Sequence, residues 1–222
     1  AGLARFFQGA VAEAEEAAQV MRQTNSVIES TGGVAGVTAG HLSDFAGELS
    51  ALAGIDDELV QSGGNVLLTF KNIKAEGGIF DDALASATDL AAHPMLGGDM
   101  AAAARMVGRA LNDPLKGVTA LTRAGVQLSD SQKAQIEQMM AYGNIAGAQR
   151  VILGELETQL GGTAEANATA SARMTVAWDN IKESIGTALL PVLDQAATKL
   201  TELAEWFTAM PSSVQAVTVG VI

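Results

Sequence analysis

The stretch RALNDPLKGVTALTRAGVQLSDSQKAQIEQMM, residues 109–140, decides the fold because it carries closely spaced signals for the start and end of helices. Asp113 is suited to cap a helix, since its carboxylate can accept a hydrogen bond from a free backbone amide. Pro114 fits the first helical position, and Gly125 fits the left-handed position that ends a helix. The sequence therefore predicts a helix over about residues 114–124.

A second helix is predicted directly after the first. Ser129 and Gln132 have the spacing that lets each side chain bond the other's backbone amide. Ile136, Met139 and Met140 then supply an apolar stripe at helical spacing. We expect a helical hairpin that contains no catalytic side chain.

The segments around this hairpin follow an order that resembles the central domain of bacteriophage tail tape measure proteins. After ALNDP (110–114) and RAGV (123–126) come GNIAGAQRVILGELETQLGGTAEANA (143–168) and IGTALLPVLD (185–194). Upstream lie LAGIDDELVQSGGNVLLTFKNI (52–73) and ATDLAAHPMLGGDMAAAARMVGRAL (87–111). The resemblance covers roughly residues 40–195 and rests on several ordered blocks.

The resemblance implies a structural protein of a siphophage virion and no enzyme. Such a protein lies in the lumen of the tail tube, sets tail length as a ruler during assembly in the host cytoplasm, and leaves the tail when the genome is ejected. The implied partners are tail tube and tail tip proteins, tail assembly chaperones and other copies of the same chain, which makes a homo-oligomer the expectation.

Composition limits the function classes that fit. The chain has 222 residues, of which 48% are hydrophobic and only 4% aromatic, so a core built from Ala, Leu, Val and Met is expected. Thirteen basic against 25 acidic residues give a net charge of −12, without a cluster of Lys or Arg. Sequence-specific binding of nucleic acid is therefore not expected.

The chain contains no cysteine, which excludes disulfides and thiolate chemistry. It shows no secretion signal and no apolar run long enough to span a membrane. Because Val214–Ile222 is apolar and an initiator Met is missing, we expect a fragment of a longer protein whose other regions make any membrane contact.

The periodicity predicts an all-α fold: a bundle of short helices flanked by two long, partly coiled-coil-like helical arms. We expect an N-terminal arm with a glycine-rich joint (1–37), a compact bundle (38–162), a C-terminal arm (163–210) and the start of an apolar segment (211–222). Pro191 is expected to kink or divide the C-terminal arm. The seam of the N-terminal arm alternates spacings of four and three and comprises Leu3, Phe7, Ala10, Ala14, Ala17, Met21, Thr24 and Ile28. The face of the C-terminal arm comprises Met174, Trp178, Ile181, Ile185, Leu189, Val192, Ala196, Leu200, Leu203 and Phe207.

Within the bundle, helices are predicted over about residues 38–53, 80–92, 99–111 and 144–160. Another is predicted to start at Asp56 or Asp57, to be interrupted at Gly63 and Gly64, and to continue to the glycines at 77 and 78. The expected apolar positions are Leu42, Phe45, Leu49 and Leu52 in the first helix, and Val66, Leu67, Phe70 and Ile73 before Gly77.

No motif predicts catalysis, a cofactor or a metal site. His41 and His93 lack a patterned third ligand, so a helix-start and a turn position explain them better than zinc does. The carboxylates at residues 56–58 and at 81–82 could serve a glycosidase, but they fall where helices begin, and capping is the favoured interpretation. Glycine pairs at 63/64, 77/78, 97/98 and 161/162 lack the Lys of a phosphate-binding loop and are interpreted as helix ends.

Trp178 and Trp206 lie among aliphatic residues at helical spacing, and core positions are favoured over ligand platforms.

Two alternatives to the tape measure function stay open. One is a helical adaptor or secreted effector that binds partner helices without catalysis. The other, less favoured, is a cell-wall hydrolase that depends on Asp56 or Asp57.

Overall fold

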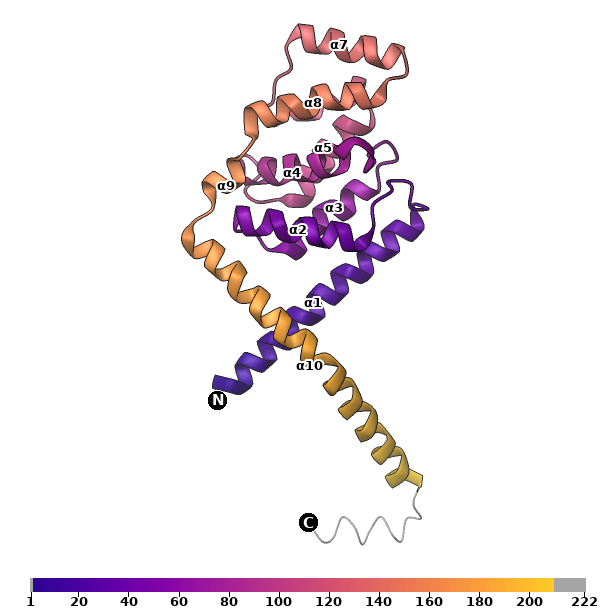
Figure 1. The fold of residues 1–222 in the computed structure, drawn as a ribbon, viewed down its shortest axis with the longest axis vertical. Helices are drawn as coiled ribbons and strands as arrows, with labels where there is room; N and C mark the ends of the chain where they lie inside the picture. The colour runs from indigo at the N-terminus through magenta and orange to yellow at the C-terminus, as the bar shows by residue number, and fades with distance from the viewer. Residues whose placement is uncertain (1, 210–222) are drawn as a thin grey trace. The chain divides into compact units, whose positions relative to one another are not determined.

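The computed structural model describes residues 2–209, and the side chains of residues 2–206. Every regular element of residues 2–209 is helical, which confirms the all-α prediction (Figure 1). The elements are α1 (Gly2–Ser30), α2 (Ala39–Ala53), α3 (Asp57–Leu68), the 3₁₀ turn η1 (Glu76–Gly78), α4 (Ile79–Ala92), α5 (Met100–Asn112), α6 (Pro114–Arg123), α7 (Asp130–Ala141), α8 (Ile145–Leu160), α9 (Thr163–Asn167) and α10 (Ala170–Ala209). The apolar segment predicted after Pro211 lies outside the described residues.

The chain forms two compact units. The larger unit comprises residues 16–179, and the smaller unit combines residues 2–15 with residues 180–209. Both boundaries fall inside long helices, within α1 and within α10. No helix of the described residues combines the length and the apolar character that crossing a membrane requires.

The larger unit has a core built mainly from Ala, Leu, Val and Ile. Phe80 on α4 is its largest fully buried side chain, and Met100 on α5 is also fully buried. Isoleucine contributes more than the composition suggested, through Ile73, Ile79 and Ile152. Residues of α2 to α8 and of the loops between them form one continuous cluster of buried apolar side chains.

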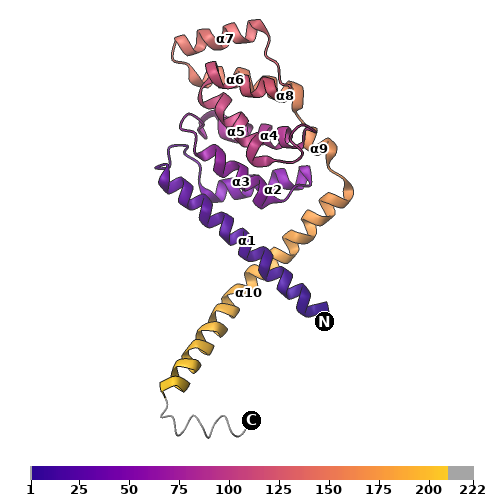
Figure 2. The same cartoon turned by 180° about the vertical axis from the view of Figure 1, so that it is seen from behind.

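The predicted helix caps are confirmed where the signal is local. The Asp113 carboxylate accepts a hydrogen bond from the Lys116 amide at 3.4 Å, and Gly125 adopts a φ of 92°. Ser129 and Gln132 form the predicted capping box at the start of α7. The resulting hairpin of α6 and α7 is seen from behind in Figure 2. Asp99 and Asn144 cap α5 and α8 in the same way.

The glycine pair at residues 63 and 64 was wrongly predicted to interrupt a helix. Both glycines lie inside α3 and are buried. A Cβ on Gly63 would come within 2.4 Å of the Met100 side chain, and one on Gly64 within 2.4 Å of Leu42. These glycines therefore let α2 and α5 approach α3 closely. The other three pairs do lie at helix ends, with positive φ at Gly77, Gly78, Gly97, Gly98 and Gly162.

Two details of the predicted bundle helices are wrong. α3 ends at Leu68, so Phe70 and Ile73 lie in the connection to η1, where Ile73 is still fully buried. In α2, Leu52 is exposed, because the buried face runs through Leu42, Ala46, Ser50 and Ala53. Small residues on that face allow close helix packing.

The C-terminal arm also differs from the prediction in its division. Its helix is broken at Ala168 and Thr169, which separate α9 from α10. Pro191 does not divide α10, which continues through it as one helix of 40 residues. Residues 187 and 188 are exposed, so water can bond the carbonyl that loses its amide partner at Pro191.

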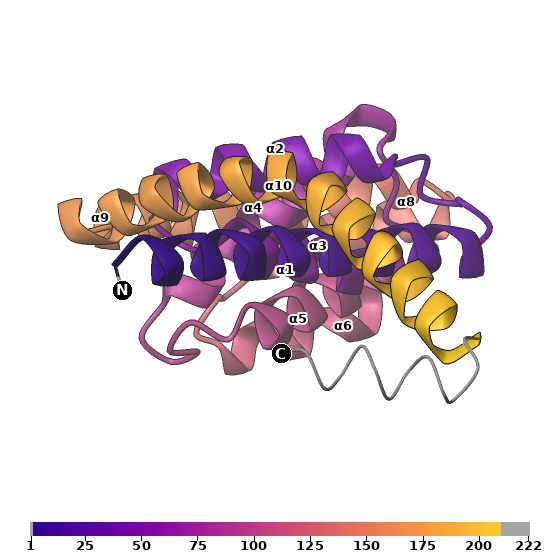
Figure 3. The ribbon, with the colours of Figure 1, turned by 90° about the horizontal axis from the view of Figure 1, so that it is seen from below.

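In the smaller unit, the first part of α1 crosses α10 (Figures 1 and 3). Gly186 marks the crossing, because a Cβ there would lie 1.8 Å from the Ala10 carbonyl oxygen and 2.8 Å from the Ala14 side chain. The Lys182 ammonium donates to the Glu13 carboxylate at 2.8 Å beside this crossing. Small residues thus set the approach of the two helices, and one ion pair flanks it.

Candidate functional site

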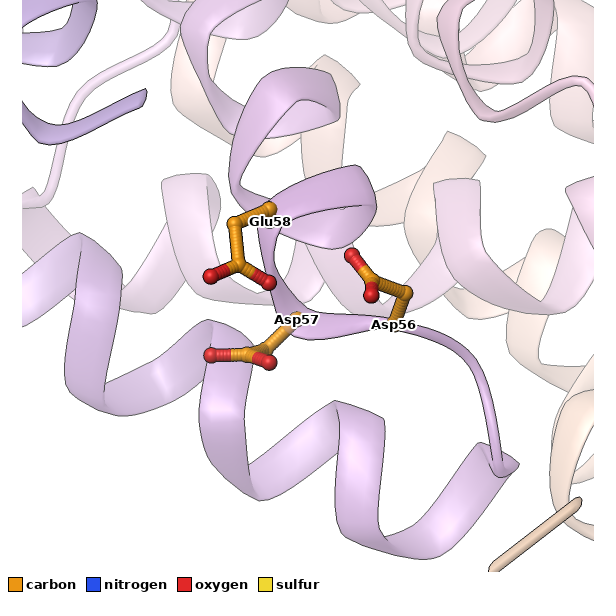
Figure 4. Close-up of side chains that lie close together, drawn as sticks. All are labelled: Asp56, Asp57 and Glu58. Carbon is orange, nitrogen blue, oxygen red and sulfur yellow. The ribbon is translucent and has the colours of Figure 1, made fainter. Parts of the chain in front are cut away.

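The acidic residues at the start of α3 are the one group of three or more His, Asp or Glu side chains among the described residues that is close enough to hold a metal ion. Asp56, Asp57 and Glu58 each offer a carboxylate oxygen, and these oxygens lie within 4.8 Å of one another. Figure 4 shows the three side chains gathered around the first turn of α3. The Asp56 carboxylate accepts a hydrogen bond from the Leu59 amide at 3.1 Å. The predicted cap is therefore confirmed, with Asp56 in that position.

The cluster holds a proton at neutral pH. Burial, followed by the charge of Asp57, raises the pKa of Glu58 to about 8. Asp56 adds to this effect, because bringing a third negative charge close to two others costs free energy. At pH 7 the three carboxyls consequently carry fewer than three negative charges.

This arrangement suits a helix start better than the alternatives considered for it. A retaining glycosidase needs two carboxyls about 5 to 5.5 Å apart on either side of a sugar bond. Here three consecutive residues share one helical turn, and Asp56 is engaged by a backbone amide. A hard cation such as Ca²⁺ takes six to eight oxygens, whereas the cluster brings one oxygen from each of three side chains within 4.8 Å of one another.

The second acidic pair takes a structural role between helices. Asp81 and Asp82 lie in the first turn of α4, as predicted, where negative charge favours the helix dipole. However, the cap position belongs to Gly78, and Asp81 instead accepts from Nε2 of His41 at 2.9 Å. Burial and the neighbouring Asp81 raise the pKa of Asp82, while Arg150 opposes that rise.

Both histidines stand where the sequence placed them. The backbone amide of His41 donates to Thr38 at the start of α2, and the imidazole links α2 to α4 through Asp81. His93 ends α4 immediately before Pro94. Neither histidine belongs to the metal-type cluster at the start of α3.

A cleft that the sequence did not predict opens where η1 meets the start of α8. Its volume is about 450 Å³, and its lining includes Lys74, Glu76 and Arg150. Gln149 is buried at the cleft, and its amide nitrogen donates to the carbonyl oxygens of Asn72 and Leu111, at 2.7 and 2.9 Å. The lining mixes both charge signs and offers amides and carbonyls, but contains no nucleophile paired with a base.

The prediction that both tryptophans lie in the core is wrong. The exposed fractions of Trp178 and Trp206 are 53% and 59%.

In the smaller unit an apolar groove of about 470 Å³ lies between α1 and α10 and is lined by Phe7 and Val11 on one side and by Leu189 and Val192 on the other. The apolar face of α10 therefore contributes more exposed surface than a core helix does.

Sequence reasoning missed Gln149 and the cleft because neither leaves a local pattern. A glutamine in a helix, here between Ala148 and Arg150, leaves the same local pattern whether it faces solvent or a buried carbonyl. The fold, which brings residues 72 and 111 to residue 149, creates the site.

Models of known protein families, curated proteins and solved structures were each compared with this chain, and none matches it.

Proposed function

We propose that this chain has the structural role of a bacteriophage tail tape measure protein and performs no catalysis. Its place is the lumen of the tail tube in the virion, after assembly in the host cytoplasm. Its partners are tail tube and tail tip proteins, tail assembly chaperones and other copies of the chain, and it leaves the tail to aid genome delivery.

The observation that supports this proposal is the ordered series of sequence blocks within residues 40–195. Those blocks correspond to helices and caps in the larger unit: the Asp113–Pro114 helix start, the turn at Gly125, the capping box at Ser129 and the glycine-ended α8. The net charge of −12 is also compatible with a chain that must not bind the genome it precedes.

A ruler requires that chain length translate into distance. An α-helix rises about 1.5 Å per residue, so the 40 residues of α10 span roughly 60 Å. The short helices of the larger unit cannot reach a comparable length while they remain packed. Under this proposal, the long helices measure distance and the packed unit occupies one place along the tail.

Graded in-frame deletions within α10, made in the phage that encodes this chain, test the ruler role by electron microscopy of the tails. The expected slope is about 1.5 Å of tail per deleted residue, which gives roughly 70 Å for removal of residues 163–209. An unrelated helical segment of equal length, put in place of the deleted one, should restore the original tail. Tails of unchanged length after deletion would contradict the ruler role of this helix.

One observation favours the adaptor as the second candidate function. The apolar groove between α1 and α10 could receive an apolar side chain of a partner helix. Neighbouring genes separate the two candidates, because tail tube genes beside this one favour the tape measure.

The hydrolase alternative predicts release of peptidoglycan fragments by the purified chain and loss of that release on Asp56→Asn substitution. An inactive chain rejects that alternative.

A further inference from the structure

We propose that the exposed apolar face of α10 binds the same face of α10 in a second copy of this chain. The part of this face within the smaller unit is called the α10 stripe. It consists of Ile181, Ile185, Leu189, Val192, Ala196, Leu200 and Leu203. This inference names the surface and the partner for the self-association included in the proposed function, and to that extent it rests on that function.

The α10 stripe is uncovered over its second half. Ile185 and Leu189 are half-buried, whereas every residue from 191 to 206 is exposed. The exposed fractions of Val192, Leu200 and Leu203 are 61%, 66% and 57%. A continuous row of large apolar side chains in water marks an interaction surface, unlike single exposed leucines.

The spacing of the stripe shows which kind of helix can cover it. Its successive gaps are 4, 4, 3, 4, 4 and 3 residues, a repeat of 11 in which Ile181, Val192 and Leu203 are equivalent. Eleven residues make about three turns at 3.67 residues per turn, close to the 3.6 of a straight helix. The stripe consequently drifts only about 20° in 11 residues, in the direction that gives a slight right-handed supercoil.

Helix α1 cannot cover the stripe along its length. The seam of α1 alternates gaps of four and three, a repeat of seven that drifts in the opposite, left-handed direction. Two stripes that drift apart can meet only over a short stretch. In the smaller unit they meet where Phe7 of α1 shares a groove with Leu189 and Val192 of α10, and every residue of α10 from 191 to 206 is exposed.

A second α10, unlike α1, can follow the stripe along its length. It carries the same repeat of 11 residues, so its apolar side chains stay opposite those of the stripe at each repeat. The surface is also continuous with an existing interface, because Leu189 and Val192 already line a groove with Phe7 and Val11 of α1. A second copy would extend that apolar contact toward Leu203.

The available area predicts a weak but specific association. Six exposed side chains, each covering roughly 100 Å², give about 600 Å² per copy and 1,200 Å² per pair, the lower limit of stable interfaces. Four of the six belong to the stripe, namely Ile181, Val192, Leu200 and Leu203, and the other two, Leu193 and Trp206, lie along its edges. A dissociation constant in the micromolar range is therefore expected. Because each copy carries a net charge of −12, added salt should tighten the complex by screening the repulsion.

Sedimentation equilibrium of the full 222-residue chain, over a range of concentrations and salt, tests the proposal. The double variant Leu200→Glu with Leu203→Glu should weaken association at least a hundredfold, because four leucines per pair are replaced by charges. The matched control is Thr198→Glu with Thr201→Glu, which adds the same charges to the opposite side of the helix. This control should associate like the unmodified chain, and circular dichroism establishes that both variants keep their helix content.

A second measurement avoids placing charge on the stripe. The chain contains no cysteine, so Leu200→Cys and Thr201→Cys each introduce a single thiol. Under mild oxidation Leu200→Cys should form disulfide-linked dimers, and Thr201→Cys should form far fewer. A chain that stays monomeric at all concentrations, or a dimer equally sensitive to both pairs of charges, overturns the proposal. Tail length is measured independently, so the ruler role and self-association can fail separately.

Discussion

Replacement of Gly117 by alanine tests how closely α6 packs on α5. A Cβ at this position would lie 2.0 Å from the carbonyl oxygen of Arg109 and 2.6 Å from the Cα of Ala110. Ordinary contact begins near 3.4 Å, so α6 would have to retreat by about 1.4 Å from backbone atoms that cannot rotate away. This movement would loosen the contacts of Leu121, which is fully buried on α6.

The magnitude follows from two opposing effects. Overpacking against a rigid backbone costs about 3 kcal/mol or more, while alanine is favoured over glycine inside a helix by about 1 kcal/mol. We expect Gly117→Ala to lower the free energy of unfolding by roughly 2 kcal/mol, and the melting temperature by about 4 to 8 °C. Urea unfolding followed by circular dichroism measures this change.

Gly154→Ala is the matched control for this measurement. Gly154 is exposed inside α8, and a Cβ there would have no atom within 4 Å. Only the helix preference remains, so this variant should be more stable than the original chain by about 0.5 to 1 kcal/mol. If the two variants unfold within about 0.5 kcal/mol of each other, the close approach of α5 and α6 is refuted.

Three further predictions concern buried polar and ionisable groups of the larger unit. Because the folded chain keeps the Glu58 proton up to about pH 8 and the unfolded chain releases it near 4.5, stability should fall as pH rises between these values. Since the group is only half-buried, Glu58→Gln should remove about 1 to 2 kcal/mol of this loss in urea titrations at several pH values. The side-chain nitrogen and oxygen of Asn65 are both buried without a hydrogen-bond partner. Asn65→Leu should therefore raise the free energy of unfolding by about 1 kcal/mol. A clear decrease in the free energy of unfolding would show that the amide does have a partner. The buried Gln61 side chain donates to the Thr24 hydroxyl at 2.8 Å. Thr24→Val should therefore lower the free energy of unfolding by about 1 to 3 kcal/mol, because it leaves the Gln61 amide without this partner. In a double-mutant cycle, adding Gln61→Leu should restore most of the lost free energy of unfolding.

The sequence predicted the parts of the fold that depend on neighbours within about four residues. The side chains of Asp113 and Ser129 each accept from an amide of the same turn, and Gly125 supplies the left-handed backbone that ends α6. All the residues that take part in such a cap lie close together in the sequence. For this reason the starts of α5 to α8 were predicted almost to the residue.

The predictions that proved wrong depend on distant parts of the chain. The pair Gly63 and Gly64 has the composition of a helix end, but its purpose is to admit Met100 and Leu42, which lie far away in sequence. The same limit applies to the acidic residues. Whether Asp81 caps its own helix or bonds His41 depends on the position of α2 beside α4. The pattern of residues within one helix does not specify that position.

The two tryptophans show what periodicity can and cannot determine. Spacing correctly placed Trp178 and Trp206 among apolar residues of a long helix, but spacing does not say what covers them. A buried tryptophan removes about 150 to 250 Å² from water, so in a chain with only 4% aromatic residues these are two of the strongest anchors available. The fold leaves both more than half exposed, while Phe80 fills the core of the larger unit. The apolar surface of α10 can then gain the free energy of burial only by contact with another surface, which the proposed self-association would supply.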